Sequence, residues 1–312
     1  LFFNKKQPLT VTATLKPLFG PKVENFSWLI DTLALLAIAL GLASSLGAGL
    51  TLVGAGIEIA YGIPQSIPIW LALAVVTCIL YTSASYLGLD KGIKLLADLN
   101  SKIFYFLLIF ILIIGPTLYI FRTSVAGMAY WLQHFWQWSL DPIDIGGEAL
   151  VMWWTLYDWA IWIAYAPLMG LFLAMISYGR TIRQFMIINW MLPATFGLIW
   201  FGIWGGTAID WQQNGVVDLV GSIKNSGAVA ALWTFLGNLP LSSILVPVVM
   251  VTLIISFATA ADVMTTTIAM LCTKNMKHNE EPPAWQKILW GVSIGAIAFF
   301  MVAFAGGVQG VD

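Results

Sequence analysis

The chain has 312 residues, of which 60% are hydrophobic and 9% are charged, and its formal net charge is −1. Because soluble globular domains carry about 25% charged residues, this composition excludes a soluble enzyme or binding module and gives no reason to expect a nucleic-acid partner. We predict an all-α polytopic membrane protein whose immediate surroundings are the lipid bilayer.

Seven apolar stretches are long enough to cross a hydrocarbon layer of about 30 Å, which takes about 20 helical residues. The runs are uninterrupted and do not alternate between polar and apolar residues, so they predict helices rather than barrel strands. We place the spans near 28–50, 68–87, 103–121, 151–176, 186–206, 242–271 and 286–306.

Lysine and arginine are distributed unevenly over the two sides of this arrangement. Twelve of the fourteen lie on one side, in segments 1–27, 88–102, 177–185 and 272–287, whereas the other side holds only Arg122 and Lys224. The positive-inside rule makes the basic side cytoplasmic. We therefore expect a multi-pass protein of the cell membrane. Cys78 and Cys272 lie in or at the end of spans and indicate neither a disulfide framework nor a metal site.

The first span is dense in small residues, as its stretch LGLASSLGAGLTLVGAGIE (40–58) shows. Small residues let helices approach closely, which is the ordinary explanation, or they leave backbone atoms free to coordinate an ion. Ser44 and Ser45 supply hydroxyl oxygens, and hard cations such as Na⁺ prefer oxygen ligands. An ion site would need a second helix with hydroxyl groups nearby.

Two segments on the side opposite the basic loops are neither short turns nor disordered. Residues 123–140 mix tryptophans with polar side chains and suit a helix that lies in the membrane interface. Residues 215–238 contain two apolar stretches around a glycine-containing break. Both could cap a translocation path or serve as simple connectors. His134 is predicted to be a surface residue.

The fourth span, with its continuation to residue 185, is the most informative part of the chain. Asp158, Trp162, Tyr165 and Met169 follow one another at steps of four, three and four, so they share one stripe of a helix. Aromatic faces attract cations, quaternary ammonium ions especially, and a carboxylate supplies the opposite charge. An interfacial belt would also explain the rings. It does not explain Asp158, since an acid at membrane depth costs roughly 2.5–3.5 kcal/mol and usually faces a cavity.

The sixth span offers the second hydroxyl-bearing helix. Its stretch SFATAADVMTTT (256–267) places Ser256, Thr259, Asp262 and Thr266 close to one face. Hydroxyl groups inside a span can simply bond back to carbonyl groups of their own helix. Asp262 has no such explanation, because it is ionisable and far from either end of the span, and we predict a functional role for it.

Several separated stretches resemble the betaine/choline/carnitine transporter family. The principal one is WTLYDWAIWIAYAPLMGLFLAMISYGRTIRQF (154–185), which resembles the signature helix of that family. Supporting matches are SSLGAG (44–49), GLDKGIKLLADLN (88–100), SFATAAD (256–262) and the EEPP turn (280–283). The motifs occur in the order of the family and cover essentially the whole chain.

This resemblance implies a twelve-helix carrier with the inverted-repeat architecture of the LeuT-type fold, which moves its substrate by alternating access. Residues 1–312 would form a single transporter domain that runs from the end of the fourth helix through the eleventh. We therefore expect a fragment without the first helices, including the broken third and most of the fourth, and without the last helix.

The resemblance also assigns roles to residues. Tyr157, Trp162 and Tyr165 would be aromatic residues of a substrate cage, with Met169 nearby. Arg180 and Arg183 would lie in a cytoplasmic loop, where they would serve gating contacts or topology.

Three positions depart from the family pattern. Ile161 replaces the first of two adjacent tryptophans, which removes one ring face from the cage. Asp158 stands where an aromatic residue is common, and we hypothesise that its carboxylate replaces the lost attraction for a cation. Tyr178 replaces the first arginine of the Arg-Gly-Arg motif.

The coupling mode follows from the same resemblance. Sodium-independent exchangers of the family carry an arginine at the position of Asn100, and this chain does not. Thr259 keeps one hydroxyl of the sodium-binding pair, whereas Ala260 lacks the other. We therefore predict sodium-coupled symport without a cofactor, with Ser44, Ser45, Thr259 and Asp262 as candidate ion ligands.

The predicted activity is secondary transport of a quaternary ammonium compound such as glycine betaine, choline or carnitine. The alternative is a LeuT-like carrier of another amine or amino acid. A membrane-embedded enzyme is disfavoured because only His134 and His278 are available and both are predicted outside the spans. A channel is disfavoured because no repeated filter is evident. A homo-oligomer is compatible with this class.

Overall fold

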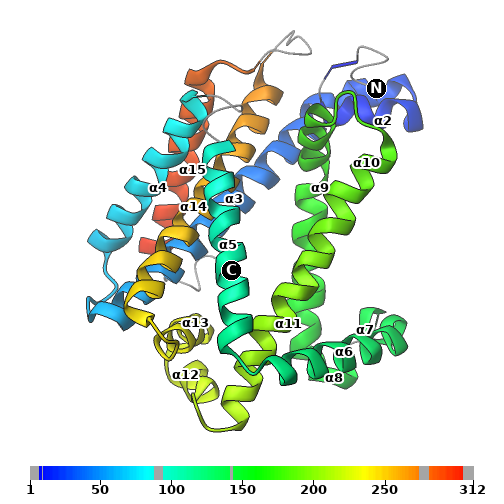
Figure 1. Ribbon diagram of the computed structural model, residues 1–312. Coiled ribbons are helices and arrows are strands. Elements are labelled where there is room, and N and C mark those ends of the chain that lie inside the picture. Colours follow the sequence, from blue (N-terminus) through cyan, green and yellow to red (C-terminus); the bar gives the residue numbers. More distant parts are fainter. Residues whose placement is uncertain (1–6, 9, 88–93, 141–142, 274–280, 305–312) are drawn as a thin grey trace. The chain divides into compact units, whose positions relative to one another are not determined.

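The computed structural model describes residues 7–8, 10–87, 94–140, 143–273 and 281–304 (Figure 1). In that part of the chain every regular element is a helix. Within the described ranges, seven helical runs are long and apolar enough to cross a membrane. The predicted all-α, multi-pass architecture is therefore confirmed.

The chain forms two compact units, and each contains segments that are distant in the sequence. The first unit comprises residues 1–100, 164–178 and 240–312, and the second comprises 101–163 and 179–239. The chain passes from one unit to the other within two helices, α5 (Lys94–Ile114) and α9 (Tyr157–Ile176). The prediction of a single transporter domain stays a prediction.

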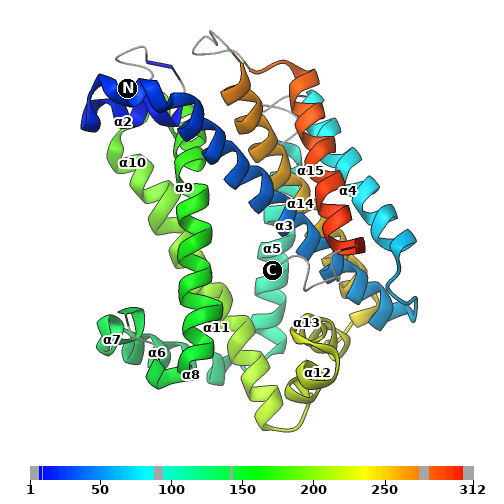
Figure 2. The same ribbon diagram turned by 180° about the vertical axis from the view of Figure 1, so that it is seen from behind.

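The first unit is built around four long helices. These are α3 (Ser27–Tyr61), α4 (Ile67–Leu87), α14 (Ser242–Cys272) and α15 (Ala284–Phe304), and they lie side by side in Figures 1 and 2. A short helix, α2 (Val11–Phe19), and a 3₁₀ turn, Pro21–Phe26, precede α3. The C-terminal half of α9 also packs against this core through Leu168, which is fully buried.

The second unit is centred on α11 (Leu192–Gln213), which packs against α6 (Thr117–Gln133). Its other helices are α7 (Phe135–Leu140), α8 (Ile143–Leu150), α10 (Ile182–Met186), α12 (Leu219–Ser226) and α13 (Ala228–Gly237). Two π-helical stretches, Val151–Leu156 and Ile187–Met191, lead into α9 and α11. Such stretches are rare and shift the register of the side chains that follow.

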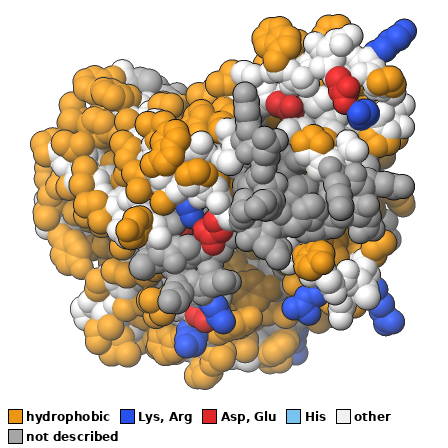
Figure 3. All heavy atoms as spheres, turned by 90° about the horizontal axis from the view of Figure 1, so that it is seen from above, with side chains coloured by type: hydrophobic (Ala, Val, Ile, Leu, Met, Phe, Trp, Pro, Cys, Tyr) orange, Lys and Arg blue, Asp and Glu red, His pale blue; other side chains and the backbone are white. Residues whose placement is uncertain are grey.

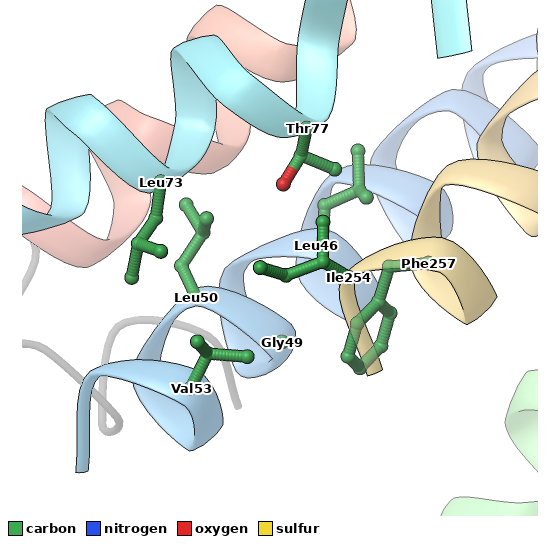
Figure 4. Close-up of a pocket in the computed structure, with 8 residues that line it drawn as sticks. All are labelled: Leu46, Gly49, Leu50, Val53, Leu73, Thr77, Ile254 and Phe257. Atoms are coloured by element: carbon green, nitrogen blue, oxygen red, sulfur yellow. The ribbon is translucent and has the colours of Figure 1, made fainter. Parts of the chain in front are cut away.

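Small residues allow the helices of the first unit to approach closely. A Cβ atom built at Gly49 of α3 would lie 2.6 Å from the ring of Phe257 on α14, so the ring rests directly on the backbone. The space left beside this contact is a cavity of about 10 Å³ between α3, α4 and α14, bordered by Leu50, Leu73 and Thr77 (Figure 4). That volume is no larger than about one water molecule. Close packing is thus one role of the small residues in the first span.

Glycine residues also allow close packing where α4 meets α15. Tyr81 is 1% exposed, and its hydroxyl donates a hydrogen bond of 2.5 Å to the backbone carbonyl of Gly291. A Cβ atom at Gly295 would lie 2.7 Å from that hydroxyl oxygen. The two glycines therefore form the groove that accepts the tyrosine ring.

Several spans differ in length from the prediction; the fifth, for example, was predicted to end at residue 206, but α11 continues to Gln213. The third was predicted to continue to residue 121, but α5 ends at Ile114 and α6 begins at Thr117. The intervening Pro116 has no N–H group and cannot continue the hydrogen-bond pattern of α5. The first span is longer than predicted and continues to Tyr61, where Gly62 adopts a left-handed conformation with φ of 68° and ends the helix.

The two segments predicted to be neither short turns nor disordered are helical. Residues 123–140 fall in α6 and α7, which are separated at His134. Residues 215–238 form α12 and α13, which are separated at Gly227 with φ of 82°. Trp233 and Leu236 of α13 are buried, so this helix is an integral part of the second unit.

Apolar side chains cover much of the face shown in Figure 3, with charged side chains at intervals among them. Large apolar side chains on the long helices are also exposed, such as Phe201 of α11 at 75% and Ile113 of α5 at 72%. Large exposed apolar surfaces are unfavourable in water and are expected where a protein meets lipid. The burial pattern therefore agrees with a multi-pass membrane protein.

Candidate functional site

Helix α9 is continuous from Tyr157 to Ile176 although it contains Pro167. The spacing that places Asp158, Trp162, Tyr165 and Met169 on one stripe is therefore a helical spacing in the structure. The boundary between the two units falls after Ile163 within this helix. The stripe consequently begins in the second unit and ends in the first.

The N-terminal part of the stripe is accessible. Trp162 is 68% exposed and Asp158 is also exposed, as is the neighbouring Tyr157, which precedes the stripe and is 44% exposed. Tyr165 and Met169 are half-buried. The predicted cage residues of the second unit thus present two ring faces and a carboxylate that are free to meet a ligand, but their role stays a prediction.

Tyr165 contacts α3 within the first unit. Its hydroxyl lies 3.4 Å from the hydroxyl of Ser45, and either group could donate the hydrogen bond. A Cβ atom built at Gly41, one turn earlier on α3, would lie 2.8 Å from Cε2 of the tyrosine ring. The sequence could not pair these residues, because 120 positions separate Ser45 from Tyr165.

The predicted ion ligands lie on α3 and α14. These helices pack against each other, so a second hydroxyl-bearing helix does adjoin the first span. Asp262 is completely buried. The Thr259 hydroxyl donates a hydrogen bond of 2.8 Å to the carbonyl oxygen of Ile255 in its own helix. Ser44 is half-buried. The structure gives Thr259 the ordinary intrahelical bond and leaves the ion-binding role of all four residues a prediction.

Asn100 is connected to the same face of α14. Its side-chain amide donates a hydrogen bond of 2.9 Å to the hydroxyl oxygen of Ser256. The Ser256 hydroxyl in turn donates a hydrogen bond of 2.8 Å to the carbonyl oxygen of Thr252. Ser256 lies three residues before Thr259, so both belong to the polar face of α14. The sequence drew attention to Asn100 and Ser256 for separate reasons, and the structure shows that their side chains are in contact.

The basic motif after α9 is exposed. Arg180 precedes α10, and Arg183 lies within it. Thr181 caps α10 by accepting a hydrogen bond from the backbone N–H of Gln184, while the Gln184 side chain accepts one from the N–H of Thr181. This capping box fixes the start of α10, so that Arg180 lies just before the helix and Arg183 lies in its first turn.

Sequence reasoning missed one buried charge. Lys287, near the start of α15, is 3% exposed, and its ammonium group lies 2.9 Å from the carboxylate of Glu281. The sequence signal was the acidic EEPP turn directly before a span that contains an early lysine. Cys78 and Cys272 are free. Among the described residues, no group of three or more His, Cys, Asp or Glu side chains could hold a metal ion.

Known proteins resemble this chain throughout its length. The model of the betaine/carnitine/choline family transporter, BCCT, matches residues 1–312. The glycine betaine transporter OpuD of Bacillus subtilis (strain 168) is 30% identical over 313 residues, which is 99% of this chain and 60% of the relative. An ectoine/hydroxyectoine transporter of Virgibacillus pantothenticus is 31% identical over 314 residues, which is 100% of this chain and 61% of the relative.

A third relative is the high-affinity choline transport protein of Escherichia coli (strain K12). It is 28% identical over 309 residues, which is 95% of this chain and 44% of the relative. The chain therefore spans between 44% and 61% of the length of these curated relatives. All three are named as transporters, which agrees with the expectation of a carrier rather than an enzyme. The match over residues 1–312 shows that this chain belongs to the betaine/carnitine/choline transporter family.

Proposed function

We propose that the chain belongs to a secondary transporter for a quaternary ammonium compound, with glycine betaine, choline and carnitine as the candidate substrates. The observation that carries the proposal is the stripe on α9. A cation meets the exposed ring of Trp162 one turn from the exposed carboxylate of Asp158. Rings attract a trimethylammonium group through their π faces, and the carboxylate adds a full negative charge.

Transport proceeds by alternating access in this proposal. A bound substrate is exposed first to one side of the membrane and then to the other while the binding residues stay near the middle of the bilayer. Tyr157, Trp162 and Tyr165 contribute rings, and Met169 lies on the same stripe. Arg180 and Arg183 stay outside the bilayer, on the cytoplasmic side.

Uptake measurements test this function directly. The protein that contains this chain is expressed in cells that lack their own osmolyte carriers, and uptake of radiolabelled glycine betaine, choline and carnitine is measured with empty-vector cells as the control. We expect saturable uptake of at least one of the three. If none of them accumulates above the control while the protein is present in the membrane, the proposal is wrong.

A carrier of another amine or amino acid is the second candidate. One observation favours it, namely that a relative 31% identical to this chain is named as an ectoine/hydroxyectoine transporter. Unlabelled ectoine and a set of amino acids are therefore added as competitors in the uptake assay. Competition by ectoine but not by betaine, choline or carnitine would favour this second candidate.

We further propose that Na⁺ drives the transport. By the family resemblance, Asn100 occupies the position at which sodium-independent exchangers carry an arginine. In support of this proposal, the uncharged Asn100 amide bonds to Ser256, three residues before the candidate ion ligand Thr259. Asp262 and the hydroxyls of Ser44 and Ser45 complete the set of candidate oxygen ligands. Uptake at full rate after replacement of Na⁺ by K⁺ would contradict the proposal.

A further inference from the structure

The face of α3 that carries Gly41, Ser45 and Gly49 holds two aromatic side chains from other helices. The three residues are spaced by four, so they lie one above another along the helix. Gly41 and Ser45 meet Tyr165 of α9, and Gly49 meets Phe257 of α14. All of these residues belong to the first unit.

The Tyr165 ring has little freedom on the side of α3. A Cβ atom at Gly41 would lie 2.8 Å from Cε2, 3.2 Å from Cζ and 3.2 Å from the hydroxyl oxygen. Any side chain at position 41 would therefore force the ring to move. The hydroxyl of Ser45, 3.4 Å from that of Tyr165, adds a weak hydrogen bond at the tip of the ring.

We propose that Gly41 and Ser45 are positioning residues that hold the Tyr165 ring in the orientation needed to bind a quaternary ammonium substrate. The inference rests on the proposed function, in which Tyr165 is one of the cage aromatics. A cation–π contact requires the cation to lie over the ring face within about 6 Å of its centre. A ring displaced by an added methyl group presents its face elsewhere, so the substrate binds less tightly.

The chain supplies a matched control in Gly49. A Cβ atom there would lie 2.6 Å from Cε2 of Phe257, so Gly49→Ala crowds an aromatic ring on the same face of the same helix (Figure 4). Phe257 is not among the predicted substrate residues. The added methyl group is more crowded at Gly49, with three ring atoms within 2.8 Å, than at Gly41, but only the one at Gly41 lies against the Tyr165 ring.

The experiment compares Gly41→Ala, Ser45→Ala and Gly49→Ala in the protein that contains this chain. KM and Vmax are measured for the quaternary ammonium compound that the wild type takes up best, with Vmax normalised to the amount of protein in the membrane. We expect Gly41→Ala to raise KM about three- to tenfold, which corresponds to loss of a cation–π contact. Ser45 is also a candidate ion ligand, so KM of Ser45→Ala is measured at saturating Na⁺, where the loss of the weak hydrogen bond to Tyr165 should raise it about twofold. Gly49→Ala should leave KM unchanged.

A double-mutant cycle shows whether Gly41 acts through Tyr165. The dissociation constant of labelled substrate is measured for purified Tyr165→Ala and for the Gly41→Ala, Tyr165→Ala double variant. Once the ring is gone, the added methyl group has nothing to displace, so the second substitution should change the dissociation constant by less than about 1.5-fold. A merely structural role of Gly41 would give the same loss in both backgrounds.

Three outcomes overturn the inference. They are a wild-type KM in Gly41→Ala, an equal rise of KM in Gly41→Ala and Gly49→Ala, and additive losses in the cycle. In each of them the wild type still transports the substrate, so the proposed function stands. A wild-type protein that takes up no quaternary ammonium compound instead overturns the proposed function and the inference together.

Discussion

Asp158 and Asp262 are both carboxylates in apolar helices, but their surroundings differ. Asp262 is completely buried in the first unit, whereas Asp158 is exposed at the start of α9. A buried charge costs free energy unless it is paired or hydrogen-bonded, so a carboxylate at the position of Asp262 needs polar or cationic surroundings. Asp158 is instead free to exchange water for a ligand. These two acids therefore suit different roles, with Asp262 in the structural or ion-binding face of α14 and Asp158 at the substrate.

Substitution of Asp158 by asparagine tests the role of its charge. Asparagine has nearly the same shape, so the helix should be kept while the attraction for a cation is lost. We expect Asp158→Asn to raise KM for a quaternary ammonium substrate about three- to tenfold, from a contribution on the order of 1 kcal/mol. Asp158→Glu keeps the charge and should recover most of the affinity. Unchanged KM in Asp158→Asn would show that its carboxylate does not contact the substrate.

Substitution of the two partners of the Lys287–Glu281 ion pair should lower the stability of the protein by different amounts. Lys287 is 3% exposed on its side chain and Glu281 is 39% exposed. Glu281→Gln leaves a buried ammonium group without its carboxylate, which should cost about 1–2 kcal/mol of stability. Lys287→Met leaves a carboxylate that water can reach and should cost less. The measurement is the thermal unfolding midpoint of the purified protein in detergent.

The control for this pair is Lys16–Glu24, which is more open to solvent, with side chains 37% and 56% exposed. Glu24→Gln should change stability by less than about 1 kcal/mol, because exposed ion pairs contribute little. A loss in Lys287→Met that equals or exceeds the loss in Glu281→Gln would contradict the assignment of the penalty to a buried, unpaired ammonium group.

At the scale of helices, the packing of α4 on α15 depends on the absence of two side chains. Gly295→Ala would place a methyl group 2.7 Å from the Tyr81 hydroxyl oxygen, which must then move away from Gly291. We expect a loss of about 1–3 kcal/mol, the usual cost of overpacking a core. Thermal unfolding in detergent measures this loss.

A glycine in open surroundings provides the comparison. No atom lies within 4 Å of a Cβ atom built at Gly205 of α11. Gly205→Ala should therefore leave stability unchanged or raise it by up to about 1 kcal/mol, since alanine favours the helix. Equal losses in the two variants would mean that a glycine-to-alanine change alone, and not the Tyr81 contact, is responsible.

The sequence predicted the existence of each long helix better than its ends. Apolar runs identify spans because the bilayer demands them, and all seven appear in the structure. The end of α5 was missed because the residues on both sides of Gly115 and Pro116 are apolar, so hydropathy shows no boundary there. Pro116 does indicate a helix end, but the length of the apolar run favoured a span that continues past it.

The candidate site was predictable along a helix but not across helices. The stripe from Asp158 to Met169 follows from a spacing of 3.6 residues per turn. The contact of Ser45 with Tyr165 and that of Asn100 with Ser256 join residues 120 and 156 positions apart. Such pairs depend on how the helices pack, and a single sequence contains no signal for them.

At the scale of the whole molecule, the functional assignments depend on the predicted orientation of the protein in the membrane. The gating role of Arg180 and Arg183 requires their loop to be cytoplasmic. Lys22 and Lys224 are both exposed, and the positive-inside rule assigns them to opposite sides. We expect position 22 to be cytoplasmic and position 224 to be external.

Cysteine labelling distinguishes the two sides. Cys78 and Cys272 are replaced by alanine, and Lys22→Cys or Lys224→Cys is introduced into that background. A membrane-impermeant maleimide should label Lys224→Cys in intact cells, whereas Lys22→Cys should react only after the membrane is permeabilised. The reverse result would invert the topology. In that case α12 and α13 would face the cytoplasm, where they could not cap a path from outside.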